Sequence, residues 1–271
     1  SFVFDIETDG FLGELTKVHC LGFADIETGA AQSFADQPGH RPIAEGLHIL
    51  QTADLIVGHN VIEFDVPAIQ KVYPKWWPPA VRDTMVSARF MWPKDKLKDG
   101  DFRKFQASRF PGQHIGAYTL EAFGYRLGNY KGDYSGSWEK WTPEMHSYME
   151  QDVNVTLHLW RRIKDEPGWP ESVFELEHDA AWIVARQMRR GVSFNVPAAG
   201  ALAAKLTGER ERIERVLKQT FPPREIREPF TPKANNSKRG YVRGVPTFKV
   251  RTEEFNPASR KQIGDRLIAM G

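Results

Sequence analysis

The sequence is short of the features that mark secreted and membrane-embedded proteins. It has a single cysteine, Cys20, among 271 residues, which excludes a disulfide framework and favours a reducing compartment. No stretch approaches the ~18 consecutive apolar residues of a membrane-spanning helix. No basic-then-apolar leader follows Ser1, so we expect no signal peptide and expect that an initiator methionine is missing. The composition, 41% hydrophobic and 27% charged, is typical of a globular protein, and the length fits roughly two domains or one large one.

Neither sign of charge dominates the whole chain, but each dominates one part of it. The 37 basic and 35 acidic side chains give a net charge of +2. Residues 1–200 carry 21 basic and 27 acidic side chains, whereas residues 201–271 carry 16 basic and 8 acidic ones. This asymmetry indicates either a carboxylate-rich site beside a segment that contacts polyanions, or two solvated surfaces with no special function.

The first 80 residues alternate between strand and helix patterns. Strands are predicted at residues 2–7, 18–23, 32–34 and 55–57, and helices at residues 43–50 and from Pro67 to about Tyr73. The run at 55–57 is short and wholly apolar, as in buried parallel strands. This order predicts a mixed sheet covered by helices, an α/β fold.

The rest of the chain is predicted to be mostly helical. Helices are expected from Thr142 to about Lys164, over residues 171–190 and over residues 198–220. Residues 94–112 are polar and punctuated by glycine and proline, and residues 222–252 are rich in proline, so we predict that both segments are loops. The composition changes at residues 165–171, where we place the boundary between two domains, 1–170 and 171–271.

Acidic side chains stand out in three places along the chain. Asp5 and Glu7 are two residues apart on a predicted strand, so both point to the same face of the sheet. Asp65 follows a buried strand at the end where open α/β sheets place ligands, although an Asp there is also a common helix N-cap. Asp152 shares a helix face with Tyr148, four residues before it. Paired carboxylates suit Mg²⁺ or Mn²⁺, because hard oxygen ligands match hard cations.

These residues form an ordered set: Asp-x-Glu at residues 5–7, Asn-x-x-x-Phe-Asp at 60–65 and Tyr-x-x-x-Asp at 148–152. The set resembles the proofreading 3′–5′ exonucleases of the four-carboxylate type with a tyrosine in the last motif, whose fold is ribonuclease-H-like. Four further motifs resemble family A DNA polymerases of short-tailed bacteriophages: GAYTLEAFGYRLG (116–128), KGDY (131–134), EHDAAW (177–182) and RGVSFN (190–195). FNPASRKQI (255–263) resembles a thumb motif of the wider family.

The resemblance implies an exonuclease domain over residues 1–170, followed by the mostly helical first part of a polymerase thumb with a basic extended loop at 222–252. It implies that Asp5, Glu7 and Asp152 hold one of two divalent cations, Mg²⁺ or Mn²⁺, that Asp5 also serves the second, and that Asp65 helps through water. Tyr148 would orient the attacking water rather than remove a proton, since an unperturbed tyrosine has a pKa near 10.

Three other side chains are candidates for contact with the substrate. Phe11 stands where these exonucleases carry an apolar side chain that wedges between the last bases, against the alternative of a core or turn-packing residue. Asn60 could bond near the terminal nucleotide or serve as a loop residue. Trp141 and Trp138 are weaker candidates than Phe11 for stacking on a base, whereas His59 is expected to be structural.

The basic part of the chain suggests contact with the DNA backbone, against the alternative of a solvated loop. The residues concerned are Lys233, Lys238, Arg239, Arg243, Lys249 and Arg251.

The implied partners are a single-stranded 3′ end of DNA and a primer–template. The polymerase palm and fingers are expected to lie outside this chain, and recruitment of a host processivity factor is left open. We expect a cytoplasmic protein, in the bacterial host if it is phage-encoded. Two other functions remain as alternatives: a stand-alone exonuclease that acts on RNA, and a non-catalytic domain that binds primer strands.

Overall fold

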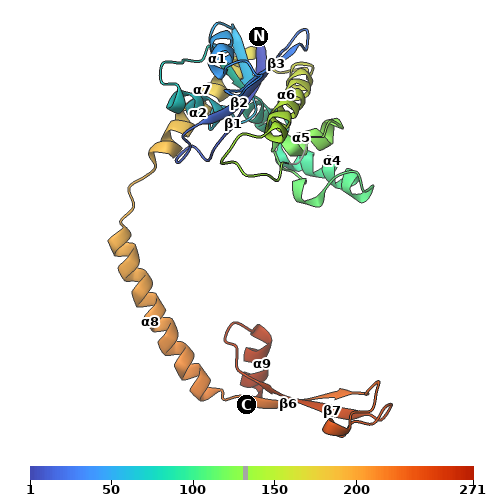
Figure 1. Ribbon diagram of the computed structural model, residues 1–271. Coiled ribbons are helices and arrows are strands. Elements are labelled where there is room, and N and C mark those ends of the chain that lie inside the picture. The colour runs from blue at the N-terminus through green and yellow to red at the C-terminus, as the bar shows by residue number, and fades with distance from the viewer. Residues whose placement is uncertain (131–133) are drawn as a thin grey trace. The chain divides into compact units, whose positions relative to one another are not determined.

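The computed structural model describes residues 1–130 and 134–271. Residues 131–133 of the KGDY motif lie outside the described residues. The chain divides into two compact units, Ser1–Gly191 and Val192–Gly271, whose elements are drawn in Figure 1. No helix in the described parts of the chain is both long and apolar enough to cross a membrane.

The first unit is built on a five-stranded mixed sheet with the strand order β3-β2-β1-β4-β5. The strands are β1 Phe2–Thr8, β2 Val18–Asp25, β3 Ala31–Phe34, β4 Leu55–Gly58 and β5 Ala80–Asp83. The β1–β2 and β2–β3 pairs are antiparallel, whereas β1–β4 and β4–β5 are parallel. The predicted mixed sheet is confirmed, and β5 is an edge strand that the sequence patterns did not reveal.

The central strand β1 separates two hydrophobic cores, because its side chains alternate between the two faces of the sheet. Phe4 and Ile6 belong to the core on one face. Val3 belongs to the second core, which also contains apolar side chains of the long helix α6. Asp5 and Glu7 share the face of Val3 and therefore lie on the side that α6 covers.

Seven α-helices lie in the described part of this unit. They are α1 Ile43–Gln51, α2 Asp65–Val72, α3 Thr84–Met91, α4 Lys94–Gln106, α5 Leu120–Leu127, α6 Pro143–Lys164 and α7 Glu171–Arg190. The start of α6 is as predicted: Thr142 is the N-cap, its hydroxyl accepts a hydrogen bond from the Met145 N–H at 3.1 Å, and Pro143 lies in the first turn.

Residues 94–112 were predicted to form a loop, and this prediction is wrong for most of the segment, which forms α4. Contacts from distant residues support the helix. The buried Asp101 carboxylate accepts hydrogen bonds from the Arg126 guanidinium at 2.8 and 3.0 Å and from the Gly116 N–H at 2.9 Å. The partners are supplied by a later part of the chain, so local composition did not predict the helix.

The first compact unit extends beyond residue 170, where the sequence placed a boundary. Helix α7 packs against β5 and α3, and its His178 is buried there. The helix ends at Gly191, as predicted, with φ +69° at the glycine. The composition change near residue 170 therefore marks a connection within the compact unit, and the unit itself ends at Gly191.

The second unit contains α8 Val196–Thr220, β6 Arg224–Phe230, β7 Thr247–Glu253 and α9 Arg260–Ala269. A 3₁₀ turn lies at Ser237–Arg239. No residue of α8 is buried within the described chain. Phe221 and Phe255 pack together with ring centroids 4.6 Å apart. In the FNPASRKQI motif, Ser259 caps α9 by accepting the Gln262 N–H.

The prediction that residues 222–252 form one extended loop is wrong at both ends of the segment. Strands β6 and β7 pair antiparallel, and the connection between Phe230 and Thr247 contains a 3₁₀ turn and an antiparallel bridge of Asn236 with Tyr241. Ion pairs link the two strands, Arg224 with Glu253 at 3.1 Å and Arg251 with Glu228 at 2.8 Å. Opposite charges facing each other stabilise a strand pair, but they do not give the apolar alternation by which strands are recognised in a sequence.

Candidate active site

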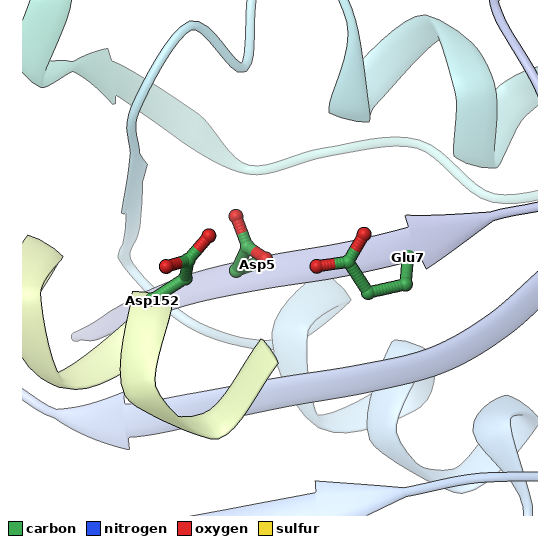
Figure 2. Close-up of side chains that lie close together, drawn as sticks. All are labelled: Asp5, Glu7 and Asp152. Atoms are coloured by element: carbon green, nitrogen blue, oxygen red, sulfur yellow. The ribbon is translucent and has the colours of Figure 1, made fainter. Parts of the chain in front are cut away.

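Three carboxylates come together on the α6 side of the sheet. Asp5 and Glu7 project from β1 and Asp152 projects from α6, and one oxygen of each lies within 4.8 Å of the others. Figure 2 shows the Asp152 carboxylate directed toward Asp5, with Glu7 farther along the same strand. Glu7 and Asp152 are buried, and Asp5 is partly buried. The structure thus joins the first and last of the three acidic motifs.

The approach of α6 to the sheet depends on a small residue in the neighbouring strand. Gly22 of β2 pairs with Asp5, and the side chains of Met149 and Val153 of α6 occupy the space where a Cβ of residue 22 would lie. Close packing at Gly22 thereby brings the helix that carries Asp152 against the strand that carries Asp5.

The cluster creates a strongly negative environment. Cys20 of β2 pairs with Glu7 across the β1–β2 ladder. Burial, followed by the negative charges of Glu7 and Asp5, raises the pKa of the Cys20 thiol. This cysteine therefore remains a protonated core side chain.

Asp65, the carboxylate of the middle motif, is near the cluster without being one of its three members. It is buried at the first position of α2 and accepts hydrogen bonds from its own N–H and from that of Ile6. Burial raises its pKa, and the negative charges of Asp83 and Asp152 raise it further. Phe64, rather than Asp65, is the N-cap of α2, so helix capping does not account for this carboxylate.

Tyr148 lies one turn before Asp152 on α6 and is partly exposed. Two aromatic rings from the preceding connection lie beside it, those of Tyr134 at 6.0 Å and Trp138 at 6.2 Å between centroids. The Trp138 carbonyl accepts a hydrogen bond from His19 Nε2 at 2.9 Å, which ties this connection to β2. Trp138, one of the two tryptophans that the sequence offers for stacking, therefore lies beside Tyr148.

The other two substrate-binding candidates occupy different surroundings. Phe11 follows β1 and is 83% exposed, in a turn where its carbonyl accepts the N–H groups of Glu14 and Leu15. Its side chain is therefore not a core residue. Trp141 packs edge-on against His40 and is near His146, with ring centroids 5.3 and 6.1 Å away.

Asn60 lies between β4 and α2 and has a left-handed backbone, with φ +68°. Its neighbour His59 is buried, with Nδ1 2.8 Å from the Thr84 hydroxyl and Nε2 2.8 Å from the Tyr118 carbonyl. These contacts agree with the structural role predicted for His59. A residue that the sequence did not indicate, Asp83, accepts the Asn60 N–H at 2.9 Å.

The candidate DNA-backbone residues all lie in the second unit. Four are exposed in the connection between β6 and β7, namely Lys233, Lys238, Arg239 and Arg243. Lys249 and Arg251 lie on β7, where Arg251 pairs with Glu228 at 2.8 Å and lies 3.7 Å from Glu253. The positive charge of Arg251 is thus partly offset within the hairpin.

The carboxylate cluster has the chemistry of a site for divalent cations. Three like charges within 4.8 Å of one another, two of them buried, repel strongly unless a cation offsets them. Carboxylate oxygens are hard ligands and match hard divalent cations. The donor set therefore fits such an ion, with Asp5, Glu7 and Asp152 as its ligands.

The chain is similar to known proteins both in its sequence and in its fold. Residues 2–90 match the family model of the RNase H superfamily, so the expected ribonuclease-H-like fold is confirmed. The DNA-directed DNA polymerases of Escherichia phage T7 and Enterobacteria phage T3 are each 28% identical to this chain over 356 aligned positions. Each alignment covers 99% of this chain and 49% of the phage protein, so the chain spans about half the length of the curated relatives it matches.

Solved structures give more distant similarities. The NrnC protein of Brucella melitensis with bound Mg²⁺ is 13% identical with a TM-score of 0.47, covering 72% of this chain and 90% of that one. A family B DNA polymerase of Pyrobaculum calidifontis is 18% identical with a TM-score of 0.36, covering 60% of this chain and 24% of that one.

Proposed function

We propose that this chain, which resembles about half of a phage DNA polymerase, is the metal-dependent 3′–5′ exonuclease region of such an enzyme and removes mispaired 3′-terminal nucleotides from DNA. The observation that carries the proposal is the joining of Asp5 and Glu7 on β1 with Asp152 on α6, on a ribonuclease-H-like fold. Tyr148 lies one helical turn from Asp152, on the same face of α6.

Each of these residues has a distinct proposed role. Asp5, Glu7 and Asp152 hold one divalent cation, Mg²⁺ or Mn²⁺, and Asp5 also serves a second. Such cations, when bound, supply positive charge that stabilises the attacking and leaving oxygens of an in-line displacement at phosphorus. Tyr148 orients the attacking water through its hydroxyl, which is a contribution of positioning. Asp65 acts through a water molecule, as its place outside the three-carboxylate cluster suggests.

Three more residues are proposed to hold the 3′ end of the strand. The exposed Phe11 is suited to wedging between the last bases, because base–aromatic stacking is tolerant of sequence. Asn60 bonds to the terminal nucleotide with its side-chain amide, and Trp141 contacts the strand farther from the cluster. Trp138 is added to this set because its ring lies 6.2 Å from that of Tyr148.

The second unit is proposed as the first part of a polymerase thumb, with the exonuclease domain before it. The exposed lysines and arginines of the β6–β7 connection contact primer–template phosphates, with Lys249 and Arg251 at the edge of that surface. The palm and fingers, and a host processivity factor where one is recruited, are the proposed protein partners. The proposed location is the cytoplasm of a bacterial host.

A substrate comparison tests the proposal. A 5′-labelled primer with a mismatched 3′ end, its matched counterpart, a single-stranded DNA and an RNA of the same sequence are each incubated with the chain and Mg²⁺. We expect a ladder that shortens from the 3′ end, fastest for the single strand and the mismatched primer. Faster shortening of RNA than of DNA would favour a stand-alone RNA exonuclease. Binding of the primer without any shortening would favour a non-catalytic domain.

A further inference from the structure

One buried carboxylate outside the cluster bonds to the chain segment that leads to Asp65. Asp83 is the last residue of β5 and the N-cap of α3, and it is 1% exposed. Its Oδ1 atom accepts hydrogen bonds from the Asn60 N–H at 2.9 Å and the Met85 N–H at 2.8 Å. Its Oδ2 atom accepts the Ile62 N–H at 3.1 Å.

Helix capping explains only part of this arrangement. A capping side chain needs one oxygen to accept N–H groups of the first helical turn, and Oδ1 of Asp83 does this for Met85. The bonds to Asn60 and Ile62 instead join β5 to the segment between β4 and α2, residues 59–64, which we call the β4–α2 loop. Asp83 therefore acts as a clamp between this loop and the start of α3.

The β4–α2 loop has an uncommon backbone conformation beside this clamp. Asn60 adopts φ +68°, which few non-glycine residues adopt, although asparagine tolerates it better than most. The loop then turns directly into α2: the Phe64 N–H bonds to the Asn60 carbonyl at 3.1 Å, and the Val66 N–H to the Val61 carbonyl at 3.0 Å. Because the two accepting carbonyls are those of consecutive residues and the two donors lie on either side of Asp65, the conformation at Asn60 influences where Asp65 begins the helix.

Asp83 is itself held from a third side by α7. The Asp83 N–H donates to His178 Nε2 at 2.7 Å, while His178 Nδ1 donates to the Phe174 carbonyl at 2.6 Å. The Ser87 hydroxyl bonds to the Asp83 carbonyl at 2.9 Å. The carboxylate is thus presented to the loop from a rigid support, which is what precise placement of neighbouring groups requires.

We propose that Asp83 is a positioning residue of the candidate active site. By accepting the N–H groups of Asn60 and Ile62, it fixes the β4–α2 loop, which carries Asn60 and leads into Asp65, the carboxylate near the three-carboxylate cluster. The inference rests on the proposed function, because it gives this loop a part in holding substrate and metal.

The test uses the full chain with the substitution Asp83→Asn. Asparagine keeps one acceptor oxygen and is a good N-cap, so it can retain the cap of α3. Its side-chain NH₂ group then faces an N–H group of the β4–α2 loop. Because both groups are donors, the hydrogen bond between residue 83 and this N–H is lost. Asp83→Ser, which also retains a capping oxygen, replaces it if Asp83→Asn does not fold.

The matched control is Asp101→Asn. Asp101 is 2% exposed, and its carboxylate also accepts a backbone N–H, that of Gly116. It supports α4 and α5 through Arg126 rather than the β4–α2 loop. This variant therefore reports what the loss of a buried structural carboxylate does when the loop is left intact.

Three quantities are measured: amide hydrogen exchange in residues 59–66, kcat per folded molecule on single-stranded DNA, and the Mg²⁺ concentration for half-maximal rate. For Asp83→Asn we expect loop exchange about tenfold faster, kcat lower by roughly tenfold to a hundredfold, and a higher Mg²⁺ requirement. For Asp101→Asn we expect a lower melting temperature with all three quantities close to those of the unmodified chain.

Two results would overturn the inference. One is a lower melting temperature of Asp83→Asn with unchanged loop exchange. The other is faster loop exchange with unchanged kcat and Mg²⁺ requirement. If the unmodified chain does not shorten DNA, the proposed function fails separately. In that case the Mn²⁺ affinities of the two variants are compared. A weaker affinity in Asp83→Asn than in Asp101→Asn supports a clamp that places the metal-binding groups, and equal affinities contradict it.

Discussion

Gly22 of β2 faces Met149 of α6 so closely that a Cβ atom at residue 22 would overlap the Met149 sulfur. The same glycine pairs with Asp5, and Met149 precedes Asp152 by about one turn of α6. The strand that carries Asp5 and the helix that carries Asp152 therefore come together beside Gly22, where the neighbouring strand has no side chain. The spacing between β1 and α6, and with it the geometry of the cluster, depends on this contact.

We expect Gly22→Ala to lower both stability and activity. The added methyl group must displace Met149 or the helix, and overpacking of this kind costs about 1–3 kcal/mol. Displacement of α6 would also move Asp152 away from Asp5. Gly100→Ala is the control, because a Cβ at this helical glycine meets no atom within 4 Å. Full activity of Gly22→Ala at an unchanged melting temperature would show that the contact does not set the geometry.

Tyr148→Phe removes only the hydroxyl that is proposed to orient the attacking water. We expect kcat to fall on the order of a hundredfold, with little change in affinity for single-stranded DNA, because the ring and its aromatic neighbours remain. Single-turnover kinetics and a binding titration separate the two quantities. The control is Tyr125→Phe, in α5. Equal kcat values for Tyr148→Phe and the unmodified chain would contradict the role given to the hydroxyl.

The exposed cations of the β6–β7 connection are expected to contribute salt-dependent affinity for DNA. The triple variant Lys233→Gln/Lys238→Gln/Arg239→Gln should reduce the slope of log K against log salt for primer–template binding by about 3, since each phosphate contact on duplex DNA contributes roughly 0.9. A control of equal charge loss is made on α8, with Arg210→Gln/Arg212→Gln/Arg215→Gln. An unchanged slope in the first variant, or an equal decrease in both, would refute a specific role for the connection.

His178 makes the folded state sensitive to acid. Burial lowers its pKa, and Nε2 already accepts the Asp83 N–H, so a proton there would break that bond. Between the lowered pKa and the ordinary value near 6.5, the unfolded chain binds more protons than the folded one. The stability that the neutral ring provides is therefore complete above about pH 6.5 and is lost as the pH falls toward the lowered pKa.

The substitution His178→Gln tests this linkage, because an amide oxygen can accept the Asp83 N–H without titrating. Urea unfolding at pH 7 and pH 5 should show a smaller loss of stability on acidification than in the unmodified chain, by at most about 1.4 kcal/mol per pH unit. The control is His48→Gln, at an exposed position of α1. The same pH dependence in both variants would indicate that His178 is not the titrating group.

The fold and the cluster could be predicted where the signals are local. Asp5 and Glu7 share a strand face by alternation, and Tyr148 and Asp152 share a helix face by their spacing, so both halves of the cluster were recognisable. The mixed sheet followed from the order of apolar strands and helices along the chain, whereas the order of the strands within the sheet, and the edge strand β5, did not. The joining of β1 with α6 depended on the ordered set of motifs, because no local pattern states which helix covers which strand.

The features that were missed depend on distant partners. Helix α4 is supported by the buried pair of Asp101 and Arg126, and the β6–β7 hairpin is linked by ion pairs across its strands. Asp83, which the sequence did not indicate, is the N-cap of α3. Only the tertiary structure shows its second set of bonds, to Asn60 and Ile62.

The proposed function is tested most directly by the double substitution Asp5→Ala/Glu7→Ala, assayed on 5′-labelled single-stranded DNA with Mg²⁺ and again with Mn²⁺. We expect the unmodified chain to produce a ladder from the 3′ end with either cation, and the double variant, folded by circular dichroism, to produce none. Continued degradation by the double variant at the rate of the unmodified chain would contradict the assignment of the nuclease to this carboxylate cluster.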